Sequence, residues 1–236
     1  MKAASLILLA LAAQQPNLPA RPTSLEYCYE SQFALAQGPY QRARPAPGAA
    51  PARIDAEDSC YRGDPGDLAK CKRIPLEPTT AWTSGARLGD WICVSDGARS
   101  GWVPASELLL EPARARPIAD WIGTWERDRG AGTVKIRATD DRQLVVSGEA
   151  TWQSGPDATP HLGDLDGTAR PSGVELVLGD PRCVAPDRGD KTDTIPVCSE
   201  CNARLLLVGT ALIITDNRMC GGMNVNFDGL YHRAKR

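Results

Sequence analysis

Histidine is scarce in this chain: only His161 and His232 occur among its 236 residues. The sequence also lacks a G-x-S-x-G nucleophile elbow, an H-E-x-x-H zinc motif and a phosphate-binding Walker loop. The two histidines lie in ATPHLGD and LYHR, where a surface or strand residue is a better interpretation than a general base. We therefore expect that the chain is not an enzyme and that it binds no cofactor.

An excess of positive charge is also absent, because 27 Lys and Arg residues stand against 29 Asp and Glu residues, giving a formal net charge of -2. A nucleic-acid-binding protein would be expected to carry a dominant basic footprint. Beyond the N-terminus, no apolar run is long enough to cross a bilayer. We therefore expect neither a nucleic-acid partner nor a membrane span.

The first 13 residues, MKAASLILLALAA, form a short apolar segment with a positive charge at Lys2 and small residues at its end. This pattern is typical of a secretory signal peptide and is too short for a membrane anchor. It predicts a signal peptide over residues 1–13 and a periplasmic or secreted mature protein. The high content of alanine, arginine and proline favours a bacterial source with a GC-rich genome.

Eight cysteines, four in each half of the chain, agree with export because an oxidising compartment preserves disulfides. The even distribution predicts two independently stapled domains. In the first half we favour the pairs Cys71 with Cys93 and Cys28 with Cys60. Four cysteines allow three connectivities, so the alternatives stay open.

In the second half, counting strand pairs outward from the Gly209-Thr210 turn places Cys201 almost opposite Cys220. Cys183 and Cys198 would then close the polar loop between them. The CSEC motif would suit redox chemistry at the start of a helix, but a hairpin pattern follows it. A zinc module would need a second C-x-x-C or paired histidines, so we expect no metal site.

Composition divides the chain into five parts. The first part is the signal peptide. Residues 14–67 are rich in Pro, Ala and Arg and are expected to be largely irregular, with a short helix over Glu30–Ala36. Residues 68–112 are expected to form a small β-domain, and 113–118 a linker. Residues 119–236 form the second domain.

The second domain has an almost wholly β pattern, in which short β-branched, aromatic or leucine-bearing runs alternate with Gly, Asp, Asn and Pro. These runs predict an antiparallel up-and-down barrel of about eight strands, closed or nearly closed. They are IGTWER, GTVKIRAT, RQLVVSGEATW, LGDLDGTAR, GVELVLG, ARLLLVG, ALIITD and VNFDGLYHR. The expected fold class is therefore all-β, with disulfides in both halves of the chain.

Over residues 80–110 the sequence resembles SH3 modules, including the bacterial SH3 domains of exported proteins. The matched pattern is a Gly-Asp-Trp entry, a glycine-bearing turn, a Gly-aromatic-x-Pro motif and a hydrophobic closing residue. It is made by Gly89, Asp90, Trp91, Gly97, Gly101, Trp102, Pro104 and Leu108. The resemblance implies an SH3-like small barrel over 68–112.

In peptide-binding members of that family a tryptophan and a proline line a groove for extended, proline-rich ligands. Carried over, the binding face would comprise Trp91, Trp102, Pro104 and Glu107, with Trp102 largely in the core. Glu107 stands where the family usually has the aromatic residue that completes the groove. A cell-wall peptide or another protein is then a better candidate ligand than a proline-rich peptide.

The alternative is that both tryptophans simply pack a small core, since aromatic side chains supply much of the buried area in such domains. Strand alternation places Trp91 and Cys93 on one face and Ile92 and Val94 on the other. The two faces cannot share one core.

The Gly123-Thr124-Trp125 entry to the second domain resembles the start of calycin-type barrels, the lipocalin and avidin group. Members of that group hold small ligands in the barrel mouth, which makes Trp125 and Trp152 candidate residues of the barrel interior. For Trp125 the favoured interpretation is a core residue that plugs one end of the barrel.

The sequence thus favours a non-catalytic exported binding protein of the cell envelope, acting through the SH3-like face on peptidoglycan peptides or an envelope protein. One alternative is a small-ligand-binding barrel with a cavity near Trp125 and Trp152. Another is a periplasmic inhibitor of a wall-cleaving hydrolase, which would present a protruding loop such as 184–197.

Overall fold

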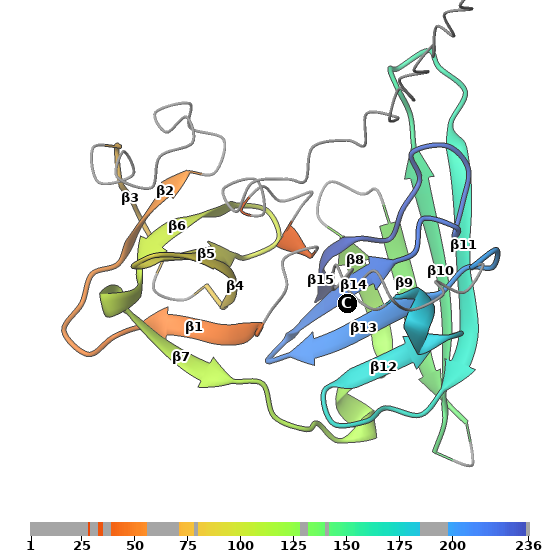
Figure 1. Cartoon of the computed structure of the whole chain (residues 1–236), viewed down its shortest axis with the longest axis horizontal. Coiled ribbons are helices and arrows are strands. Elements are labelled where there is room, and N and C mark those ends of the chain that lie inside the picture. Colours follow the sequence, from red (N-terminus) through yellow and green to blue (C-terminus); the bar gives the residue numbers. More distant parts are fainter. Residues whose placement is uncertain are drawn as a thin grey trace, which may run out of the picture.

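The computed structural model shows a nearly all-β chain built from two antiparallel sheets (Figure 1). The seven-stranded sheet comes from the first half of the sequence and the eight-stranded sheet from the second. The structure describes residues 28, 33–34, 39–55, 71–77, 80–127, 132–139, 142–184 and 198–234. The expected signal peptide and most of the expected helix Glu30–Ala36 lie outside these residues.

The first sheet has the strand order β3-β2-β6-β5-β4-β1-β7. A 3-10 turn, η3 (Ala105–Glu107), connects β6 to β7. The strands are β1 (Gln41–Pro45), β2 (Ala52–Asp55), β3 (Ile74–Pro75), β4 (Trp82–Leu88), β5 (Trp91–Ser95), β6 (Ser100–Pro104) and β7 (Leu108–Pro112).

The prediction that residues 14–67 are largely irregular was wrong where it covered β1 and β2. In β1, buried Ala43 alternates with exposed Arg42 and Arg44, which is the period of a half-buried strand. The strand forms because β4 and β7 pair with it on both sides. Its proline-rich, arginine-rich composition concealed that pattern, and its partners are remote in sequence.

The second sheet is an up-and-down meander in the order β11-β10-β9-β8-β15-β14-β13-β12. Pairing of the first strand with the last, β8 with β15, curls it into a nearly closed barrel. The strands are β8 (Gly123–Arg127), β9 (Gly132–Ala138), β10 (Leu144–Trp152), β11 (His161–Ala169), β12 (Glu175–Leu178), β13 (Ala203–Val208), β14 (Ala211–Asp216) and β15 (Gly229–Arg233).

The barrel stays open between β11 and β12, the two edge strands of the sheet, which no backbone ladder among the described residues joins. They are nevertheless adjacent, because a Cβ added to Gly167 would lie 3.1 Å from Leu178 Cδ2. The predicted eight-stranded barrel is thus confirmed, and each predicted run overlaps one of its strands.

One run differs in length, because 225–233 was predicted to be a strand and β15 begins only at Gly229. Side chains replace ladder bonds just before that point. Asp216 Oδ2 accepts the N–H of Phe227 at 2.5 Å, and Asp228 Oδ1 accepts the N–H of Asp216 at 2.8 Å. These local bonds satisfy the backbone without a partner strand.

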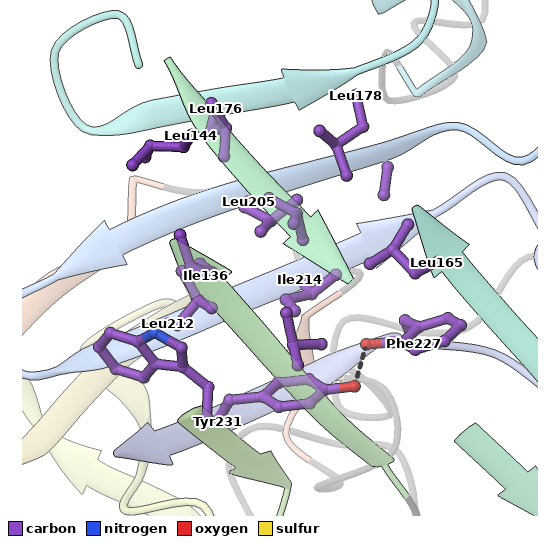
Figure 2. Packing of buried hydrophobic residues seen from close by; sticks show 14 of the residues in the cluster. Ile136, Leu144, Leu165, Leu176, Leu178, Leu205, Leu212, Ile214, Phe227 and Tyr231 are labelled. Carbon is purple, nitrogen blue, oxygen red and sulfur yellow. Dashed lines mark hydrogen bonds between the residues drawn. The ribbon is translucent and has the colours of Figure 1, made fainter. Parts of the chain in front are cut away.

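The barrel interior is filled by packed side chains (Figure 2). Leu144 from β10, Leu165 from β11 and Leu205 from β13 are each fully buried and belong to this one core. The hydroxyl of Tyr231 donates to the carbonyl of Phe227 at 2.9 Å, which satisfies the one polar atom of that ring. Packed side chains therefore fill the interior of this barrel.

The first sheet is covered on both faces. Ile92 and Val94 belong to its own core, together with Trp82, Val103 and Leu108. Cys93 and Trp102 instead join a second cluster, as the alternation along β5 predicted.

That second cluster bridges the two halves of the chain. It joins Cys28, Phe33, Tyr40 and Ile54 to barrel residues whose side chains point outward, namely Val208, Ala211, Ile213 and Leu230. The two stapled halves are therefore packed against each other rather than separate, and the shared cluster fixes their arrangement.

Of the predicted disulfides, Cys183–Cys198 and Cys201–Cys220 are confirmed. In the first half the favoured pairing was wrong, because Cys28 is bonded to Cys93. The bond ties the segment before β1 onto the buried face of β5, a contact that loop length alone does not reveal. Cys71 is also disulfide-bonded, and Cys60 lies outside the described residues.

Candidate functional site

The predicted binding face lies at one end of the β5–β6 hairpin. Trp91 stands directly opposite Pro104, and both are half-buried. The β4–β5 turn that brings the chain to Trp91 uses Gly89 with a φ of 57°, a left-handed conformation that suits glycine. The indole of Trp91 packs on the edge of the cluster that bridges the two halves.

Trp102, the second tryptophan assigned to that face, is fully buried. It stands opposite Cys93, and the Cys28–Cys93 bond and the barrel cover this part of the sheet. Trp102 is thus a core residue and is not accessible to a ligand. Of the two tryptophans assigned to the face, Trp91 alone reaches the surface, beside Pro104.

Glu107 has a structural partner instead of an open groove. Its carboxylate accepts hydrogen bonds from the Arg73 guanidinium and, at 3.3 Å, from the N–H of Ala52. Arg73 also donates to the carbonyl of Ala52. The residue that replaces the expected aromatic therefore anchors the start of β2 to η3.

The barrel candidates Trp125 and Trp152 differ in exposure. Trp125 is 1% exposed, and its indole N–H donates to the carbonyl of Trp121 at 2.9 Å. The Arg233 guanidinium lies 4.7 Å from the centroid of the Trp125 ring and donates to the carbonyl of Asp120 at 2.6 Å. Trp152 is half-buried and meets the ring of His161 edge-on.

A buried carboxylate that sequence reasoning missed lies at the start of β15. Asp228 is 2% exposed, and its ion pair with Arg218 has an N–O distance of 2.6 Å. Burial, reinforced by the negative charge of Asp216, raises the pKa of Asp228 to about 6. Arg218, the N–H of Asp216 and Arg127 oppose that rise. Sequence shows the aspartate but not its burial.

Three surface hollows are lined by described residues. The first, of about 430 Å³, lies between β1, β7, the linker and the β13–β14 turn. The second, of about 310 Å³, adjoins it and shares Pro112, Ala113 and Val208. The third, of about 300 Å³, lies on the outer face of β9, β10 and β11. Neither Trp125 nor Trp152 lines any of the three.

The third hollow is lined by Asp164 and Asp166, which both lie within β11, one of the strands that the sequence predicted. Within the described ranges, no group of three or more His, Cys, Asp or Glu side chains is arranged to hold a metal ion. Nor does that part of the chain contain a helix with the length and apolar character required to cross a bilayer.

No protein-family model, curated protein or solved structure matches this chain. The functional assignment therefore depends on the geometry of the described residues.

Proposed function

We propose that the chain is a non-catalytic, exported binding protein of the cell envelope whose first domain is SH3-like. Its partner is a cell-wall peptide or an envelope protein, bound at the surface end of the β5–β6 hairpin. The observation that carries this proposal is the juxtaposition of Trp91 and Pro104, which stand opposite each other and are both half-buried.

The positions of the matched residues support the SH3-like assignment. Gly97 lies in the β5–β6 turn with a φ of 92°, and Pro104 ends β6 just before η3. Leu108, the hydrophobic closing residue, is buried in the core of the first sheet. Export is supported by the disulfides, which an oxidising compartment preserves.

Burial limits the size of the proposed site. Because Cys93 and Trp102 are covered by the chain itself, a ligand reaches only the end of the face at Trp91 and Pro104. Such a site suits the end of a peptide or a short cross-bridge better than a long extended segment. The small-ligand alternative draws no support from the packed barrel interior.

The test is retention of the purified mature protein on insoluble peptidoglycan. We expect wild-type protein to be retained and Trp91→Ala to be lost from the pellet, because the indole supplies the apolar contact surface. Trp152→Ala is the matched control, since it removes a half-buried tryptophan from the barrel instead.

Thermal unfolding of both variants shows whether they remain folded. Equal retention of the Trp91 and Trp152 variants would show that Trp91 is not part of the binding site. Absence of wild-type retention would exclude peptidoglycan as the partner and leave an envelope protein.

A further inference from the structure

The hollow of about 430 Å³ at the seam between the two halves has features of a second binding site. Its floor is the face of β1 and β7 that carries Arg42 and Glu111 and is turned toward the barrel, and one wall is the β13–β14 turn. Gly209 in that turn approaches the stem of Arg42 so closely that a Cβ there would lie 3.5 Å from Arg42 Cδ. Since the shared cluster holds the halves together, the hollow is preformed.

Positive charge dominates the lining. Four arginines border the hollow, two from β1 (Arg42 and Arg44) and two from the linker (Arg114 and Arg116), against a single carboxylate, Glu111. Arg116 is paired with Asp120 beside the hollow at 2.7 Å. Arg114 is exposed and has no ion pair or hydrogen bond with any other described residue, so the lining keeps a net excess of positive charge.

The ion pairs inside the hollow are easily exchanged. Glu111 lies 2.7 Å from the guanidinium of Arg44 and 3.7 Å from that of Arg42. The two arginine side chains are 54% and 55% exposed. Exposed pairs of this kind contribute little to stability, so an incoming carboxylate can replace Glu111 at small cost.

The spacing of the charges fits an extended chain. Arg42 and Arg44 are two residues apart on one face of a strand, which separates their Cα atoms by about 7 Å, as do alternate residues of an extended peptide. The neighbouring hollow continues the seam with apolar side chains of Tyr40, Leu206 and Val208. A ligand of several residues can therefore lie along both hollows.

The edge of the sheet offers backbone partners as well. The N–H of Ala46 donates to the carbonyl of Glu107 at 2.9 Å, which fixes the register of the β1–β7 bonds. By antiparallel alternation, the N–H and C=O of Leu110 then point away from β1, toward the open side of β7. An extended peptide can pair with such an edge.

We propose that this seam binds an extended acidic peptide with carboxylate side chains at alternate positions, at a site separate from Trp91 and Pro104. Alternate carboxylates of the peptide pair with Arg42 and Arg44 in place of Glu111, and Arg114 adds a further positive charge. Apolar side chains of the peptide contact the second hollow.

The test is fluorescence anisotropy of labelled eight-residue peptides with the full mature chain. The probes are alternating Glu-Ala, alternating Gln-Ala, and a block peptide with four Glu followed by four Ala. We expect the alternating acidic peptide to bind at least about tenfold tighter than the other two, and Arg44→Gln or Arg114→Gln to weaken it by about tenfold. Arg137→Gln on the exposed face of β9 removes the same charge elsewhere and is the control.

Equal affinity for the alternating and block peptides would overturn the proposal, because it would reflect only general attraction of negative charge. An equal loss in Arg44→Gln and Arg137→Gln would also overturn it. Trp91→Ala should bind the acidic peptide as tightly as wild type does. Loss of peptidoglycan retention therefore reports on the Trp91 site, and loss of peptide binding reports on the arginine-lined hollow.

Discussion

Replacing the buried carboxylate of Asp228 by an amide should remove a pH dependence from the stability of the folded chain. The Asp228→Asn side chain keeps the oxygen that accepts the N–H of Asp216, but it cannot ionise. The charged groups around it are Asp216, Arg218 and Arg127. The substitution therefore isolates the titration of one carboxyl.

The magnitude follows from the rise of the pKa of Asp228 from 3.8 to about 6. Between these pH values the folded chain binds more protons than the unfolded chain, so the free energy of unfolding falls as the pH rises. The total fall is about 3 kcal/mol, and about 2 kcal/mol of it lies between pH 4.5 and 7.5. The stabilisation is therefore present in acid and lost above pH 6.

The assay is urea unfolding followed by tryptophan fluorescence at several pH values from 4.5 to 7.5. We expect the stability of wild type to decline relative to Asp228→Asn across this range. Asp180→Asn is the matched control, because Asp180 is only half-buried and its hydrogen bonds with Arg182 hold its pKa at about 2, below the range measured. If the difference between wild type and Asp228→Asn does not change with pH, the reasoning about burial is refuted.

Two further predictions concern the seam and the disulfide that borders it. Ile213→Ala should destabilise the whole chain by about 2–5 kcal/mol, because the side chain is 1% exposed in the shared cluster. The measurement is urea unfolding, and a first half that keeps its stability would contradict this prediction. The double variant Cys28→Ala with Cys93→Ala should lower the free energy of unfolding by about 4 kcal/mol, because the disulfide joins residues 65 apart in sequence. Calorimetry that shows no fall in Tm would contradict this prediction.

Strand period and cysteine spacing were sufficient to predict the barrel and its two disulfides. Runs such as ALIITD contain their own signal, and the Gly209-Thr210 turn sets the register that brings Cys201 near Cys220. Those relations are local in sequence. The β1 strand was missed because its partners β4 and β7 are far along the chain, and nothing within QRARP specifies them.

The candidate sites were less accessible to sequence reasoning for the same physical reason. The SH3 resemblance identified Trp91 and Pro104 but could not show that Cys28 is bonded to Cys93 beside them. The arginine-lined hollow joins β1, the linker and the β13–β14 turn, which meet only after both sheets have folded. Burial of Asp228 likewise depends on tertiary packing.

The sheet of the first half has two covered faces, and the cover of one comes partly from the outer wall of the barrel. Recombination that transplanted either half onto a foreign neighbour would leave Trp102 or Ile213 with no complementary surface. The two halves should consequently be exchangeable only together, and a substitution on one side of the shared cluster should require a compensating change on the other.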